Sequence, residues 1–196
     1  MGTVQRFASL VLAAGAGSRF GGGKLLAQYR GAPLLHAALA AARAAPADEI
    51  TVVTGADAGA VAAAVAAFDP AIRIVHAPDH AEGMAASLRT GIASLGPQVE
   101  AAFVFLGDMP RVPHAVLAPL AQAVAAGAPA AAPVFQGRRG NPVVLGRALF
   151  GEVAQLRGDL GARPILQRLG AEVALVEADD DGVLFDVDEP GDLPPG

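Results

Sequence analysis

Cysteine is absent from this chain of 196 residues, and aromatic side chains make up only 5% of it. Without cysteine the protein has no disulfide, no thiolate nucleophile, no cysteine-ligated zinc and no iron–sulfur cluster. One tyrosine and no tryptophan leave few rings on which single-stranded nucleic acid could stack. The formal net charge of -5 provides no basic surface for a phosphate backbone. We therefore expect a protein that binds no nucleic acid and works in the reducing cytoplasm.

Long hydrophobic runs of the kind that enter membranes are also missing. Residues 7–16 superficially resemble a signal peptide, but they contain few large aliphatic side chains. Residues 112–136 carry no formal charge, yet alanine and proline supply much of that segment, whereas membrane insertion favours larger side chains. We interpret the first stretch as a buried strand and the second as a helix followed by a strand, and we expect no contact with a membrane.

Apolar runs of strand length alternate with alanine-rich segments of helix length. The expected strands are residues 7–13, 50–54, 72–76, 101–106, 130–135, 142–145 and 173–177. The expected helices are residues 33–45, 58–68, 84–95 and 113–126. Continuously apolar strands between helices are typical of a parallel sheet that is covered on both faces. The pattern predicts an α/β fold with a mostly parallel, Rossmann-like sheet and helices on both faces.

The second half of the chain is less regular than the first. Residues 136–140 lie between two strand-like runs and predict a small β-hairpin excursion from the sheet. No linker, charge block or internal repeat divides the sequence. We therefore expect a single domain over residues 1–196.

A glycine-rich loop follows the first strand, at the sheet edge where ligands of such folds bind. Residues 12–24 read Leu-Ala-Ala-Gly-Ala-Gly-Ser-Arg-Phe-Gly-Gly-Gly-Lys. Glycines let backbone amides converge on an anion, and Arg19 and Lys24 add positive charge. The loop departs from a P-loop because Leu25 replaces the metal-binding hydroxyl. It departs from a dinucleotide loop because Phe20 stands at the third glycine position.

Lys24 is the single lysine of the chain, against thirteen arginines. Arginine is used wherever a generic cation suffices, so a compact ammonium at this position suggests a point contact with a nucleotide phosphate. A surface lysine left by chance is the alternative. The histidines offer no zinc site, because Pro78 separates His76 from His80 and prevents a helical pair.

Six short motifs follow one another along nearly the whole chain. They lie at residues 12–26, 82–88, 107–110, 137–143, 158–163 and 186–192. In this order they resemble the MobA-like nucleotidyltransferase family, and most closely its molybdenum cofactor cytidylyltransferases, which are MocA-like. The resemblance implies Mg²⁺-dependent transfer of CMP from CTP to the phosphate of molybdopterin, with release of pyrophosphate.

Carboxylates at the sheet edge are the candidate metal ligands. Asp108 directly follows an apolar strand, where a carboxylate suits Mg²⁺, although an aspartate that holds the turn is the alternative. The resemblance implies that Asp108 is the metal ligand. A second ligand should come from Asp186 or Asp188, at the end of an expected late strand over residues 183–187. Alternation along a strand places both on one face, so spacing does not choose between them.

The resemblance also implies two sets of binding residues. The nucleotide-binding set is Leu12, Ala13, Ala14, Gly15, Gly17, Ser18, Gly83 and Ser87. The acceptor-binding set is Arg139, Gly140, Asn141, Pro142 and Asp159. Residues 1 to about 110 would form the nucleotide-binding half and residues 111–196 the acceptor half. Ser87 as an ordinary helix-start serine and Arg139 as a solvated hairpin tip are the alternatives, and Asn141 departs from the histidine common in the family.

A phosphate nucleophile is already ionised at neutral pH, so the implied reaction needs no general base. Arg19, Lys24 and the loop amides would act with Mg²⁺ to neutralise charge. The pair Ala13-Ala14 favours CTP over GTP. The alternatives are a GTP-using molybdopterin guanylyltransferase, a MobA-like transferase for a sugar or polyol phosphate, and a catalytically silent cofactor-binding chaperone. An acceptor molybdoenzyme or its chaperone is the expected protein partner.

Overall fold

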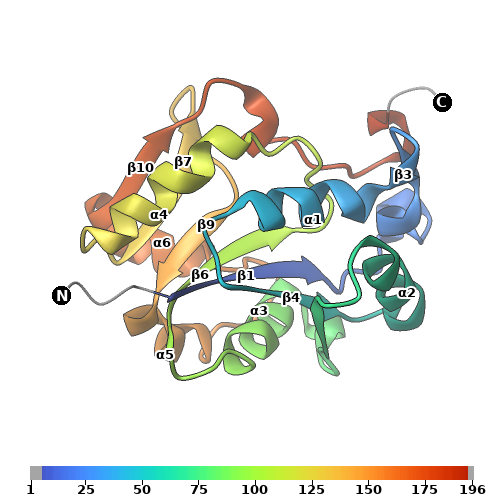
Figure 1. Cartoon of the computed structure of the whole chain (residues 1–196), viewed down its shortest axis with the longest axis horizontal. Helices are drawn as coiled ribbons and strands as arrows, with labels where there is room; N and C mark the ends of the chain where they lie inside the picture. Colours follow the sequence, from blue (N-terminus) through green and yellow to red (C-terminus); the bar gives the residue numbers. More distant parts are fainter. Residues whose placement is uncertain (1–5, 194–196) are drawn as a thin grey trace.

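An eight-stranded sheet forms the centre of the molecule in the computed structural model, which describes residues 6–193 (Figure 1). Its strands are β1 (Arg6–Ala13), β4 (Glu49–Thr54), β5 (Arg73–His76), β6 (Val99–Leu106), β7 (Ala130–Phe135), β8 (Arg138–Arg139), β9 (Val143–Gly146) and β10 (Val173–Glu177). A separate two-stranded sheet consists of β2 (Gln28–Tyr29) and β3 (Ala32–Pro33). The main sheet has the order β10-β7-β9-β6-β1-β4-β5, with β8 paired to β7.

Parallel pairing dominates this sheet, as the sequence predicts. The strands β6, β1, β4 and β5 are parallel neighbours, and β10 is parallel to β7. Only β8 and β9 pair in the antiparallel sense. The turn between β7 and β8 has φ angles of 50° at Gln136 and 75° at Gly137, the conformation of a tight hairpin. The α/β fold and the hairpin excursion are therefore confirmed.

Helices cover both faces of the sheet. On one face lie α1 (Leu34–Ala44), α2 (Ala58–Phe68) and α4 (Leu117–Ala125), and on the other lie α3 (Met84–Ala93), α5 (Phe150–Val153) and α6 (Arg163–Leu169). Figure 1 shows α1 and α4 crossing in front of the strands. Phe103 and Phe105 of β6 pack into the first of these two cores, whereas Ala102 and Val104 pack into the second. Within residues 6–193, no helix is long and apolar enough to cross a membrane.

Two local predictions are wrong, and two short helices were not predicted. Residues 183–187 do not form a strand: a 3-10 turn, Asp181–Val183, leads into an extended segment without strand pairing. The helix expected from residue 113 begins as a 3-10 turn, and α4 starts only at Leu117. The short helices α5 and α6 were not expected, because four and seven residues are too few to show a helical period.

The segment that follows Asp181–Val183 is fixed by contacts with distant parts of the chain. The amide of Val187 donates to the carbonyl of Asp108 at 3.0 Å, and the amide of Asn141 donates to the carbonyl of Val183 at 2.8 Å. The Arg111 guanidinium lies 4.5 Å from the centre of the Phe185 ring. These contacts bring residues 183–187 to the carboxyl edge of β6.

Gly140 packs closely against the backbone of Val183, and replacing Gly140 tests this contact. A Cβ at Gly140 would lie 2.2 Å from the Val183 carbonyl oxygen. We expect Gly140→Ala to lower the free energy of unfolding by about 2 kcal/mol, because a backbone segment would have to shift. The matched control is Gly151→Ala in α5, where a Cβ meets nothing within 4 Å and should raise stability by roughly 0.5 kcal/mol. Urea unfolding followed by circular dichroism measures the free energy of unfolding of both variants. Equal stability of Gly140→Ala and the wild type would contradict the close contact between Gly140 and Val183.

Candidate active site

The glycine-rich loop is held in a conformation that few other residues adopt. Gly17, Gly21, Gly22 and Gly23 have φ angles of 59°, 92°, 95° and 62°, a region that is strained for residues with a Cβ. The amides of residues 15–19 donate no hydrogen bond to any other part of the described chain. Such amides, following a strand at the sheet edge, can bind an anion.

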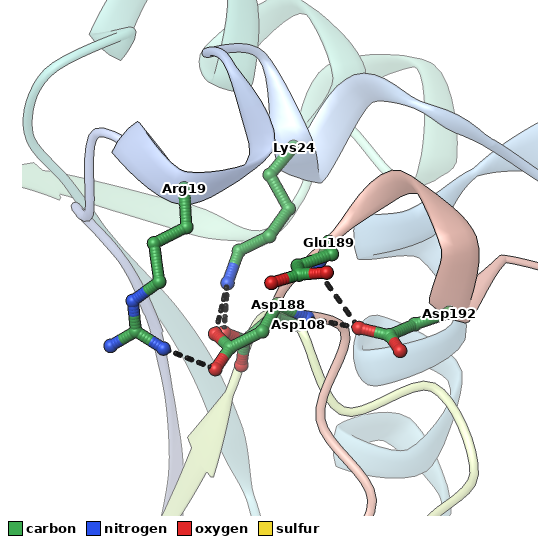
Figure 2. A network of polar contacts seen from close by, with 6 residues as sticks. All are labelled: Arg19, Lys24, Asp108, Asp188, Glu189 and Asp192. Carbon is green, nitrogen blue, oxygen red and sulfur yellow. Dashed lines mark hydrogen bonds and ion pairs between the residues drawn. The ribbon is translucent and has the colours of Figure 1, made fainter.

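Lys24 forms the centre of a network of ion pairs (Figure 2). Its Nζ lies 2.7 Å from Oδ2 of Asp108 and 3.7 Å from Oδ1 of Asp188. Arg19 Nη1 lies 2.5 Å from Oδ2 of the same Asp188. The Lys24 side chain is 13% exposed and that of Asp108 is 23% exposed, so this pair is shielded from solvent more than a surface salt bridge.

Asp188 is held in place by its own loop. Oδ2 of Asp192 accepts hydrogen bonds from the amides of Asp188 and Glu189, both at 2.8 Å. The bonds from Glu189 and Asp188 lower the pKa of the Asp192 carboxyl, because they stabilise its charged form. Asp192 therefore orients the backbone at the residue that pairs with Lys24 and Arg19.

A third carboxyl, that of Asp186, is affected by the two carboxylates of this network. Partial burial raises the pKa of Asp186, and repulsion by Asp108 and Asp188 raises it further. Within residues 6–193, no group of three or more His, Cys, Asp or Glu side chains could hold a metal ion. Two carboxylates without further protein ligands fit Mg²⁺ or a similar hard cation, which completes its coordination with waters and substrate phosphates.

A cavity of about 480 Å³ lies beside the glycine-rich loop, and all residues of the expected nucleotide-binding set line it. Lys24, Asp108 and Asp159, which was expected in the acceptor-binding set, also line it. The other lining residues were assigned to neither binding set: Ala16, Leu25, His80, Ala81, Met84 and Leu106. Ser87 is 4% exposed in α3 and lines the same cavity. The structure thus gathers this set around one space, while the role of each residue remains a prediction.

A second cavity, of about 450 Å³, adjoins the first. Four of the five expected acceptor residues line it, namely Arg139, Gly140, Asn141 and Asp159. Leu12, Met84, Leu106 and Asp159 line both cavities. Arg163, the last residue of the Gly158–Arg163 motif, lines this cavity beside Asp159. The missed residues include Leu160, for which the same motif was the available signal, and Gln167, which lies outside it.

Four of the expected site residues line neither cavity: Arg19, Pro142, Asp186 and Asp188. Arg19 and Asp188 nevertheless reach the site through the ion pairs with each other and with Lys24. Asp186 has no ion pair within residues 6–193. Pro142 is buried. The ion pairs therefore favour Asp188 over Asp186 as the second candidate ligand, a choice that the spacing in the sequence left open.

Lys24 and a bound cation should compete for the same two carboxylates. We expect Lys24→Met to bind Mn²⁺ roughly fivefold more tightly than the wild type without nucleotide, since a partly shielded ion pair contributes on the order of 1 kcal/mol. Isothermal titration calorimetry with MnCl₂ measures the change. Arg43→Met, which removes a pair with Asp69 elsewhere, is the control. Unchanged or weaker Mn²⁺ binding in Lys24→Met would contradict the competition.

Several known proteins share this sequence and architecture. Nicotine blue oxidoreductase from Paenarthrobacter nicotinovorans is 33% identical over 187 residues, which cover 91% of this chain and 90% of the relative. Rv0371c from Mycobacterium tuberculosis H37Rv is 32% identical and superposes with a TM-score of 0.84 over 97% of this chain and 96% of that one. A structure of the same protein in complex with manganese is 30% identical, with a TM-score of 0.78 over 91% of this chain and 90% of that one.

A nucleotidyl transferase from Methanothermobacter is 26% identical, with a TM-score of 0.79 over 95% of this chain and 94% of that one. The family model described as the MobA-like NTP transferase domain matches residues 9–173. This match spans the glycine-rich loop, Lys24, Asp108 and both cavities. The chain belongs to the MobA-like NTP transferase domain family.

Proposed function

We propose that this nucleotidyltransferase transfers CMP from CTP to the terminal phosphate of molybdopterin, with a divalent cation and release of pyrophosphate. The observation that carries the proposal is the pair of adjoining cavities with Lys24 and Asp108 in the wall of the first. One cavity suits a nucleotide and its neighbour suits an acceptor. Their shared wall puts the two substrates next to each other, as transfer requires.

The triphosphate has a set of cationic partners. Lys24, Arg19 and the free amides of residues 15–19 gather positive charge and donors at the end of β1. Asp108 and Asp188 would hold the cation, Mg²⁺ or Mn²⁺, which would neutralise charge on the phosphate oxygens. The manganese complex of Rv0371c supports a divalent cation in this family. When substrate binds, we propose that Lys24 and Arg19 exchange their carboxylate partners for phosphate oxygens.

The second cavity offers the chemistry of an anionic acceptor with an apolar body. Arg139 and Arg163 supply charge, while Asn141 and Gln167 supply hydrogen-bonding amides. The Arg139 guanidinium donates to the Leu166 carbonyl at 3.1 Å, so α6 holds it at the cavity wall. In this proposal residues from 111 onward form the acceptor half, and the nucleotide-binding half precedes them.

In the transfer step, an oxygen of the acceptor phosphate forms a bond to the α-phosphorus of CTP. The bond from that phosphorus to the bridging oxygen of the β-phosphate breaks, and pyrophosphate leaves with the electron pair. No proton has to be removed from the nucleophile, because a phosphate is ionised at neutral pH. Lys24 and Arg19 stabilise the negative charge that is redistributed in this step.

The choice of CTP rests on the Ala13-Ala14 form of the loop, and GTP is the first alternative. A sugar or polyol phosphate as acceptor, and a silent cofactor-binding chaperone, also remain alternatives. We propose a cytoplasmic enzyme that delivers its product to a molybdoenzyme or to the chaperone of that enzyme.

Nicotine blue oxidoreductase, the 33% identical relative, supports a second candidate: an oxidoreductase with the same fold. Residues 15–20 lack the third glycine of a dinucleotide-binding loop, whereas the ion pairs of Lys24 with Asp108 and Asp188 support a site for phosphate and a metal ion. The geometry therefore favours nucleotidyl transfer, and titration with NADH and NADPH separates the two candidates.

Pyrophosphate release is the direct test of the proposed function. Purified protein would be mixed with Mg²⁺, molybdenum-loaded molybdopterin and, in parallel, CTP, GTP or ATP. We expect release with CTP and little with the others. Release with GTP alone would identify a guanylyltransferase. No release despite nucleotide binding would exclude molybdopterin as the acceptor or indicate a binding protein.

Removing charge from the network should abolish this release. We expect Asp108→Asn and Lys24→Met to lower kcat by about 100-fold or more, because each removes a group that stabilises transition-state charge. The exposed Glu172 lies outside both cavities, and Glu172→Gln should retain wild-type kcat. Retained activity in Lys24→Met would contradict the assignment. Lys24→Met should also separate metal binding, which strengthens, from turnover, which is lost.

A further inference from the structure

We propose that His80 recognises the 4-amino group of cytosine and so makes the enzyme select CTP over UTP. This inference rests on the proposed function, because it assumes that a cytidine nucleotide occupies the cavity beside the glycine-rich loop. His80 is a residue of that cavity's wall that no sequence motif singled out. Its ring lies against a fixed backbone group, which determines what the other ring nitrogen can do.

The position of His80 follows from the sheet. A Cβ at Gly55, just after β4, would lie 2.8 Å from the His80 Cβ and 2.4 Å from the Ala14 carbonyl oxygen. His80 therefore lies at the end of β4, two strands along the edge from β6 and Asp108. Neighbouring strands are about 4.8 Å apart, so roughly 10 Å of sheet edge separate the ring from the phosphate and metal groups. That is the end of the cavity away from Lys24 and Asp108, where a base would lie when its phosphates contact Lys24.

The hydrogen bond of Nδ1 fixes the tautomer. Nδ1 lies 3.0 Å from the carbonyl oxygen of Ala77, and a carbonyl oxygen only accepts, so Nδ1 carries the proton. Ala77 is fully buried, and its amide donates to the Thr54 carbonyl at 2.9 Å, which anchors this acceptor to β4. In the neutral ring Nε2 is then an acceptor, and it has no hydrogen-bond partner within residues 6–193.

An acceptor at this position distinguishes the two pyrimidines. The 4-amino group of cytosine donates a hydrogen bond, whereas the 4-oxo group of uracil only accepts. UTP would place two lone pairs opposite each other and leave Nε2 without a donor, which weakens binding. The nearby Ser87 hydroxyl both donates and accepts, so it does not impose the same selection.

Binding without acceptor tests the inference independently of transfer. Isothermal titration calorimetry with Mg²⁺ would compare CTP and UTP for the wild type, His80→Phe, His80→Gln and the control His76→Phe. His76 lies next to His80, with ring centres 6.0 Å apart, but lines neither cavity. We expect the wild type to bind CTP about tenfold more tightly than UTP. In His80→Phe the ratio of the CTP affinity to the UTP affinity should approach one, because CTP binds more weakly.

His80→Gln should restore most of the selectivity, because the glutamine side-chain oxygen can accept at the position of Nε2, and His76→Phe should keep it. An unselective wild type, an unchanged ratio in His80→Phe, or an equal loss in His76→Phe would overturn the inference. Circular dichroism confirms that each variant is folded. Selective CTP binding without pyrophosphate release would support the role of His80 and reject the proposed acceptor. The experiment therefore distinguishes failure of this inference from failure of the proposed function.

Discussion

The ammonium of Lys24 between Asp108 and Asp188 is the contact on which the site depends. It joins three segments that are remote in the sequence: the loop after β1, the end of β6 and the segment near the end of the chain. Without a cation at this point, the two carboxylates would face each other at the sheet edge beside Asp186. Burial is the largest cause of the raised pKa of Asp186, and repulsion by Asp108 and Asp188 adds to it. In the proposed reaction, Asp108 and Asp188 hold the metal ion once Lys24 has turned to a phosphate oxygen.

The same contact connects the ligand-free molecule to its proposed chemistry. A cation bound by the carboxylates would release Lys24 and Arg19, and a triphosphate would then satisfy both side chains. The bound cation replaces Lys24 and Arg19 as the partner of the carboxylates, and the triphosphate replaces the carboxylates as the partner of Lys24 and Arg19. Binding of the metal ion therefore favours binding of the nucleotide, and the reverse also holds. Metal and nucleotide should therefore bind cooperatively without any large movement of the fold.

Much of the fold and part of the site could be predicted from the sequence. Apolar strands and the glycine-rich loop place Lys24 and Asp108 at one sheet edge, since Asp108 follows β6 and Lys24 ends the loop that follows β1. Asp188 could not be separated from Asp186, because residues 183–187 are not a strand and are positioned by the hydrogen bond from Val187 to Asp108. His80 was missed for a similar reason: its role depends on contacts with Ala77, Gly55 and Ala14 rather than on a motif. Such long-range backbone contacts leave no periodic pattern in the sequence.

The two cavities meet at α3, where segments from the first and second parts of the chain are in contact. Gly83 precedes α3, and a Cβ there would lie 2.3 Å from Oδ1 of Asp159. The amide of Ala85 donates to the Gly158 carbonyl at 2.9 Å. The loop from the second half therefore lies directly on the start of a helix from the first half, and Asp159 faces both cavities. Because both segments build the wall between the two cavities, a shift of either one would, in the proposed reaction, change the distance between the reacting phosphates.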